Sequence, residues 1–159
     1  MVIQWMHTSA VFLSSSVSLN SKKITSLLRF LALADQIELL GPFDSVIASI
    51  RAVLVLDNEN LLPEHVRAGV LLPLNHPVRK LFAQSCIRPY LFYIHSKQRA
   101  QSAVYIRFRF ERELKESTDF AADLLRELSD VMISAGSTSN GVSRATLTDP
   151  LSGNQFRYN

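Results

Sequence analysis

The chain has 159 residues and a mass of 17.9 kDa, which suits one compact domain because a single core usually serves about 100 to 200 residues. With 47% hydrophobic and 19% charged residues and a mean hydropathy of +0.11, it has enough apolar side chains to bury a core, which excludes disorder throughout. The single cysteine, Cys86, excludes an intrachain disulfide scaffold and favours an intracellular, reducing setting. Four scattered histidines form no recognisable metal-ligand set, and the absence of an apolar stretch of about 18 residues argues against a membrane span.

Residues 1–34 contain no acidic residue and are rich in Ser, so a targeting segment is one interpretation of them. A secretory signal places positive charge before its apolar stretch, whereas here Lys22 and Lys23 follow the apolar residues 11 to 13. We therefore expect residues 1–20 to be an N-terminal arm that is exposed or bound to a partner. Trp5 in this arm either docks onto its own domain or inserts into an adjacent subunit, where aromatic side chains concentrate binding energy.

The next part of the chain predicts amphipathic helices. Residues 22 to 34 have helical spacing of apolar residues, and a second pattern follows Gly41-Pro42 and begins near Asp44. The two expected apolar faces consist of Ile24, Leu27, Leu28 and Leu31, and of Phe43, Val46, Ile47, Ile50, Val53 and Leu54. Shorter helices are predicted from Pro63 towards Leu72, and from Pro77 through Phe82.

After Arg88-Pro89 the pattern favours two β-strands. Residues 90–95 are aromatic and apolar, and residues 104–110 alternate strictly between apolar side chains and the outward set Tyr105, Arg107 and Arg109. Residues 96–101 between them are expected to form the loop of a central antiparallel hairpin.

A long amphipathic helix is predicted next, with Ser117 or Thr118 as its N-cap and Gly136 at its end. Its expected inner face is Phe120, Leu124, Leu125, Leu128, Val131 and Met132, and its expected solvated face is Asp119, Asp123, Arg126, Glu127 and Asp130. The pair Asp123 and Glu127, one helical turn apart, has too few oxygen ligands for a metal site, so a solvated face is the simpler interpretation.

The remainder is a polar tail, residues 137–159, in which Asp149-Pro150-Leu151-Ser152-Gly153 predicts the turn of a small hairpin between residues 145–148 and 155–158. The whole pattern predicts an α+β fold, with N-terminal amphipathic helices, a central antiparallel β-hairpin and a C-terminal amphipathic helix. The expected organisation is the arm, a single globular domain at 21–136 and the tail.

The net charge of +3 conceals a block pattern along the chain. Residues 1–34 carry +3, residues 35–64 carry −5, residues 65–110 carry +8 with no acidic residue, and residues 111–130 carry −4. The basic block also contains aromatic residues, so cations would neutralise phosphates while rings stack on bases. The predicted nucleic-acid-binding residues are Arg88, Lys97, Arg99, Tyr105, Arg107 and Arg109. Internal neutralisation by the carboxylates that follow is the alternative interpretation.

Catalytic signatures do not occur at recognisable spacing. The glycines are isolated, no Gly-x-Ser-x-Gly turn is present, and Cys86 falls late in an apolar helix, which favours a buried, inert thiol. The pairs Glu64-His65 and Asn75-His76 are more typical of helix starts or surface groups than of an acid and a base.

The sequence therefore predicts a non-enzymatic binding and assembly protein without a cofactor. The first hypothesis is a nucleic-acid-associated subunit, binding RNA or DNA, that forms a homo-oligomer. The alternative is a self-assembling structural or scaffold protein, such as a viral or organellar assembly component, whose charge blocks pair between subunits.

Overall fold

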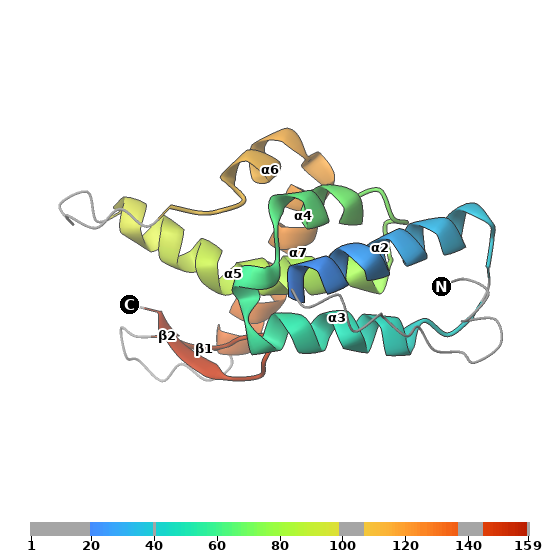
Figure 1. Ribbon diagram of the computed structural model, residues 1–159. Helices are drawn as coiled ribbons and strands as arrows, with labels where there is room; N and C mark the ends of the chain where they lie inside the picture. The colour runs from blue at the N-terminus through green and yellow to red at the C-terminus, as the bar shows by residue number, and fades with distance from the viewer. Residues whose placement is uncertain (1–19, 40, 99–106, 137–144, 159) are drawn as a thin grey trace. The chain divides into compact units, whose positions relative to one another are not determined.

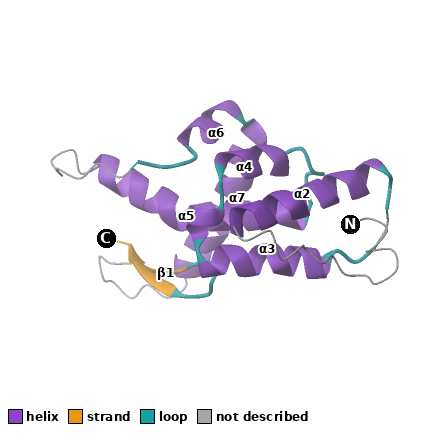
Figure 2. Cartoon of the chain, in the orientation of Figure 1, coloured by secondary structure: helices purple, strands orange, loops and turns teal. Residues whose placement is uncertain are grey.

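The computed structural model describes residues 20–39, 41–98, 107–136 and 145–158 (Figure 1). The elements are α2 (Asn20–Gln36), α3 (Asp44–Leu56), the 3₁₀ turn η1 (Asn58–Asn60), α4 (Pro63–Gly69), α5 (Pro77–Gln98), α6 (Glu111–Glu116), α7 (Thr118–Gly136), β1 (Ala145–Thr148) and β2 (Gln155–Tyr158). Over these residues helix dominates, and the sheet has two antiparallel strands near the C-terminus (Figure 2). The α+β class is confirmed, with helix as the larger share.

The chain divides into two compact units between Val78 and Arg79, within the first turn of α5. The N-terminal unit contains α2, α3, η1 and α4, and the C-terminal unit contains the rest of α5 together with α6, α7 and the hairpin. The predicted arm, apart from Asn20, and its Trp5 lie outside the described residues.

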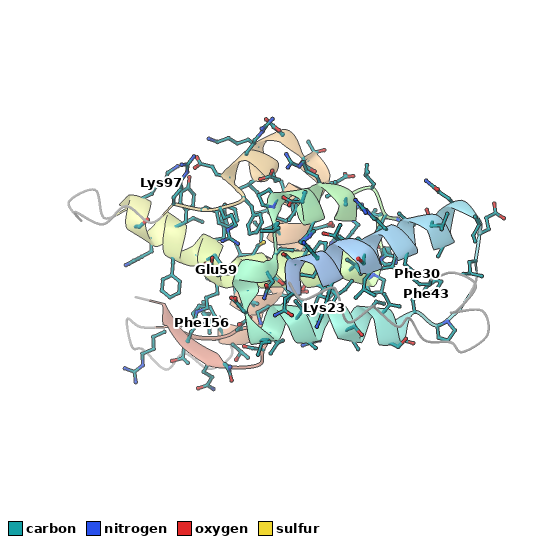
Figure 3. The ribbon with its side chains drawn as sticks, viewed as in Figure 1. Lys23, Phe30, Phe43, Glu59, Lys97 and Phe156 are labelled. Carbon is teal, nitrogen blue, oxygen red and sulfur yellow. The ribbon has the colours of Figure 1, made fainter. Side chains whose placement is uncertain are left out.

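Helix α2 forms the centre of the N-terminal unit, where it contacts both α3 and α4. The predicted apolar face of α2 is buried, and so are three residues of the predicted face of α3, namely Val46, Ile50 and Leu54. The rings of Phe30 and Phe43 meet edge to face at 5.8 Å between centroids (Figure 3). The predictions of these two helices, and of a helix starting at Pro63, are confirmed.

His65 joins the start of α4 to α2. Its Nδ1 accepts a hydrogen bond from the backbone N–H of Leu62 at 3.1 Å, and its Nε2 lies 2.9 Å from Oγ1 of Thr25, which donates to the carbonyl of Ser21. Because Nδ1 is an acceptor, the imidazole must be neutral with its proton on Nε2. Burial accordingly lowers the pKa of His65, partly opposed by the carboxylate of Glu64.

Helix α5 contradicts the prediction of a strand at residues 90–95 and of a loop starting at Ser96, because it continues without interruption to Gln98. Pro89 lies inside it although proline lacks the N–H that an interior helical position normally uses. The aromatic residues pack at helical spacing instead, with Tyr90 and Tyr93 three residues apart and both in contact with Phe108. Burial of these rings outweighs the strand propensity of the aromatic run.

The second predicted strand is also wrong where the structure describes it. Residues 107 and 108 have no regular secondary structure, residues 109 and 110 form a turn, and residues 99–106 lie outside the described part. The predicted alternation nevertheless holds, since Phe108 and Phe110 are buried while Arg107 and Arg109 are exposed. The periodicity arises from Phe108 packing on α5 and from Phe110 packing on Phe108 and on Phe120 of α7, not from a β-ladder.

Helix α7 begins as predicted, with Oγ of Ser117 accepting the N–H of Phe120 at 3.2 Å. The predicted division of its faces is partly wrong. Asp123 and Glu127 are buried, whereas Leu125 and Met132, expected inside, are exposed. The other assignments hold, since the predicted inner residues Phe120, Leu124 and Val131 are buried and the predicted outer residues Asp119, Arg126 and Asp130 are exposed. The carboxylates point inward because α5 supplies cationic and amide partners for them.

The terminal hairpin is confirmed, with Thr146 opposite Arg157 and Leu147 opposite Phe156. In its turn, Asp149 accepts the N–H of Leu151 at 3.0 Å, and Gly153 adopts a φ of +76°, a conformation that glycine tolerates best. Contacts of β1 with α7 hold the hairpin on the C-terminal unit, as expected for a strand pair that is marginal alone.

We predict that the N-terminal unit loses stability under mild acid. His65 and half-buried His76, whose Nδ1 accepts the N–H of Val78 at 3.2 Å, both have pKa values lowered by burial below their unfolded value of about 6.5. Their contribution is complete above that value and is lost as pH falls through it towards the folded pKa. Urea unfolding followed between pH 7.5 and 5.5 should show a falling free energy of unfolding.

The matched variant carries His65→Asn and His76→Asn, which keep a hydrogen-bond acceptor without a titrating ring. Its free energy of unfolding should change less over this pH range. An equally steep pH dependence in the variant would contradict the assignment.

Candidate nucleic-acid interface

The predicted basic block is divided between the two compact units. Arg67 belongs to α4 in the N-terminal unit, whereas the other described cations of the block belong to the C-terminal unit. The side chain of Arg79 is only 4% exposed, which withdraws it from any binding surface. Charge that is continuous in the sequence is therefore divided in the fold.

Two cations at the start of α5 are neutralised by α7, as the alternative interpretation of the charge pattern expected. Nε of Arg79 donates to the buried carboxylate of Asp123 at 2.8 Å, and Asp119 lies 3.8 Å from the same guanidinium. Nζ of Lys80 lies 3.7 Å from Glu127, which also accepts a 2.8 Å hydrogen bond from the amide of Gln84. These contacts connect α5 to α7, and in them Arg79 and Lys80 pair with carboxylates of their own chain.

Arg88 is exposed, but it contacts the hairpin rather than the other predicted site residues. Its guanidinium carbon lies 5.8 Å from the ring centroid of Phe92 and 5.7 Å from that of Phe156 (Figure 3 labels Phe156). Arg88 and Lys97 are separated by about two and a half turns of α5, at roughly 3.6 residues per turn, and therefore lie on opposite sides of the helix. The structure thus separates Arg88 from Lys97.

Lys97 and Phe108 both contact Tyr93, and Arg107 and Arg109 flank Phe108 in the sequence. The ammonium of Lys97, near the C-terminal end of α5, lies 4.6 Å from the centroid of the Tyr93 ring (Figure 3). The ring of Phe108 lies 5.8 Å from that of Tyr93, so its two neighbouring arginines are held beside the same part of α5. We call Lys97, Arg107 and Arg109 the cation cluster; all three are exposed.

The two remaining predicted site residues, Arg99 and Tyr105, lie outside the described residues. Both belong to the segment that connects Gln98 to Arg107, between the two parts of the cation cluster. Their assignment to the interface stays a prediction from the sequence.

Two of the three carboxylates of α6 pair with cations of the same helix, and the third, Glu113, is buried. Nζ of Lys115 lies 2.8 Å from Glu111, and Arg112 pairs with Glu116 one turn away at 2.9 Å. Hydrogen bonds from Lys115 and then from Tyr93 lower the pKa of Glu111, which is therefore ionised near neutral pH. Lys97 and residues 107–116 together have five basic and three acidic side chains, a net charge of +2.

Three aromatic residues next to the cluster are part of the hydrophobic core and do not expose their ring faces. Tyr93, Phe108 and Phe110 are each buried, with exposed fractions of 5%, 1% and 4%. Phe108 contacts Tyr90 and Phe110 edge to face, and Phe110 in turn contacts Phe120 of α7. These buried faces cannot accept a stacked base, so the described part of the site is suited to phosphates.

Neither a reactive thiol nor a metal-holding group of side chains occurs among the described residues. Cys86 is buried, and burial raises the pKa of its thiol far above neutrality, which makes it unreactive. No group of three or more His, Cys, Asp or Glu side chains in the described part of the chain is arranged to hold a metal ion. Among the helices described, none combines the length and apolar character needed to cross a membrane.

Comparison of this chain with protein-family models, with curated proteins and with solved structures found no match.

We predict that Asp123→Ala destabilises the C-terminal unit by roughly 3 kcal/mol, because it leaves the buried guanidinium of Arg79 without its closest carboxylate. Urea unfolding measures this change. The double variant Arg79→Met with Asp123→Leu should recover most of the lost stability, since it replaces the pair by apolar groups of similar size.

Glu116→Ala is the matched control, because it breaks the ion pair of α6 with Arg112, whose side chain is 71% exposed. It should leave the free energy of unfolding almost unchanged. A loss from Asp123→Ala no greater than that from Glu116→Ala would contradict a structural role for the buried pair.

Proposed function

We propose that this protein is a non-enzymatic binding protein whose C-terminal unit contacts the phosphate backbone of nucleic acid through the cation cluster. The observations that support the proposal most are the packing of Phe108 on Tyr93, the ring that Lys97 also contacts, and the exposure of Arg107 and Arg109 on either side of Phe108. Three exposed cations on one surface would neutralise neighbouring phosphates and release counterions. Arg99 and Tyr105 remain proposed contacts in the same region.

The chemistry of the cluster favours binding that depends weakly on base sequence. Lysine and arginine contacts to phosphates fix the position of a protein on nucleic acid without reading bases. The nearby aromatic residues with exposed fractions of 5% or less have no free face for stacking. We therefore propose an affinity that is governed by salt and similar for different base sequences.

We predict that the triple variant Lys97→Gln, Arg107→Gln and Arg109→Gln loses most of the affinity for a 20-base-pair DNA or RNA duplex. Each lost phosphate contact should also reduce the slope of log affinity against log salt by up to roughly 0.9. Fluorescence anisotropy of a labelled duplex at 50 to 200 mM salt measures both quantities.

The matched control is the triple variant Arg29→Gln, Arg51→Gln and Arg67→Gln, which removes the same charge from exposed positions of the N-terminal unit. It should retain most of the affinity. Equal losses in the two variants would show that total charge, and not the cation cluster, is responsible.

A second function, self-assembly as a structural or scaffold protein, is favoured by a different observation. Leu125, Met132 and Ile133 on α7 are 58%, 46% and 69% exposed, and clustered exposed apolar residues are typical of interaction surfaces. We propose self-association of the purified chain, which sedimentation equilibrium over a hundredfold concentration range would detect. A monomer at all concentrations would reject this function and leave the nucleic-acid proposal untouched.

A further inference from the structure

Glu111 is the first acidic residue after the basic block of residues 65–110. Helix α6 starts at this residue, directly after buried Phe110. The backbone N–H of Glu111 donates to the carbonyl of Phe108 at 3.2 Å, and Phe108 is itself buried on α5. The position of Glu111 is therefore fixed by the same packing that holds Phe108 in place.

The carboxylate of Glu111 interacts with groups from two helices. Nζ of Lys115, one turn further along α6, donates to it at 2.8 Å. Tyr93 of α5 also donates a hydrogen bond to it, and both hydrogen bonds lower the pKa of Glu111. The ammonium of Lys97, which lies 4.6 Å from the centroid of the Tyr93 ring, favours the same negative charge (Figure 3 labels Lys97). One anionic group thus interacts with two lysines and a phenol.

This arrangement differs from an ordinary ion pair on a helix surface. Arg112 and Glu116 of the same helix are the ordinary case, because both are exposed and they contact each other one turn apart. Such a pair stabilises a helix slightly and needs no group from another element. Glu111, by contrast, has a side chain that is only 25% exposed and that is hydrogen-bonded to α5 through Tyr93.

The groups around Glu111 are suited to phosphate as well as to a carboxylate. Ammonium groups and a phenol hydroxyl donate hydrogen bonds, and phosphate oxygens accept them as carboxylate oxygens do. The side chain of Lys115 is 71% exposed, so an anion from solution reaches its ammonium. Breaking an exposed ion pair costs little, which allows a phosphate to replace the carboxylate as the partner of Lys115.

We infer that Glu111 competes with phosphate for Lys115 and Lys97, so that nucleic acid binds beside the cation cluster by displacing this carboxylate. Lys115 then becomes a further phosphate contact. The inference rests on the proposed phosphate binding, to which it adds an autoinhibitory contact and one more cation. Without this contact the protein should bind nucleic acid more tightly and with a steeper salt dependence.

The variant Glu111→Gln tests the competition. It keeps the shape of the side chain and an oxygen that accepts from Tyr93, but it removes the negative charge. Affinity for the labelled duplex at low salt should rise about fivefold, as expected for removing one charge at about 4 Å in water. The slope of log affinity against log salt should become steeper by up to roughly 0.9, the contribution of one further phosphate contact.

The matched control is Glu116→Gln, which removes the same charge from the other ion pair of α6 and should raise the affinity less. Two double variants, equal in total charge, separate Lys115 from charge in general. Glu111→Gln with Lys115→Gln should lose the gain, whereas Glu111→Gln with Arg112→Gln should keep most of it. The side chains of Lys115 and Arg112 are each 71% exposed, so the comparison is matched in exposure as well as in charge.

Equal gains from the two single variants, or equal losses in the two double variants, would overturn the inference, because total charge would then explain the data. If the unmodified protein binds the duplex as tightly as Glu111→Gln does, phosphate binding stands and the competition is wrong. If neither protein binds, the proposed function fails and the inference fails with it.

The unmodified protein provides an independent measurement that needs no variant. Adding the duplex should shift the NMR signals of the side-chain ammonium groups of both Lys97 and Lys115, because Lys115 exchanges its carboxylate for a phosphate. A shift of the Lys97 signal alone would show that Lys115 stays paired with Glu111, and would overturn the inference.

Discussion

The burial of Phe108 against α5 determines where the cations of the C-terminal unit lie. Its ring is in contact with Tyr90, Tyr93 and Phe110, and only 1% of the residue is exposed. Burying a phenylalanine side chain contributes about 2 to 3 kcal/mol, which is enough to hold a short segment that has no hydrogen-bonded ladder of its own. The flanking residues Arg107 and Arg109 are exposed, and Lys97 contacts the same Tyr93 ring on which Phe108 packs.

A second constraint is the polar contact between α5 and α7. Buried carboxylates need partners, and Arg79, Lys80 and Gln84 provide them for Asp123 and Glu127. This pairing buries Arg79, whereas Lys80 stays 60% exposed beside Glu127. It also holds Asp123 and Glu127 inward, while Leu125, Met132 and Ile133 lie outside. The same contact therefore shapes both proposed surfaces.

Sequence patterns predicted the elements whose signals are local. The N-cap Ser117, the Pro63 start of α4 and the turn at Asp149 depend on hydrogen bonds within a few residues, and each is present in the structure. The prediction of a strand at residues 90–95 is wrong because aromatic residues occur both in strands and on buried helix faces. Pro89 also indicated a helix boundary, whereas α5 continues through it to Gln98. For residues 107–110, alternation correctly identified which side chains are buried but not the structure that buries them.

The burial of Asp123 and Glu127 on α7 differs from the prediction for a related reason. A carboxylate can be buried when a segment far away in the sequence brings a cation to it, and a local sequence pattern does not show which distant segments come together. The available signal was the spacing of Asp119, Asp123 and Glu127 at intervals of four, which matches Arg79 and Lys80 at the start of another helix. Of the predicted site residues, three cluster, Arg88 lies on the other side of α5, and two lie outside the described residues.

The most direct test of the central claim is the salt dependence of nucleic-acid binding by the unmodified protein. Affinity for a duplex of mixed sequence should fall linearly with salt on logarithmic axes, with a slope of roughly −2 to −3 for about three phosphate contacts. Duplexes of different base sequence should give nearly the same slope. No detectable binding at 50 mM salt, or binding that salt leaves unchanged, would contradict phosphate binding by the cation cluster.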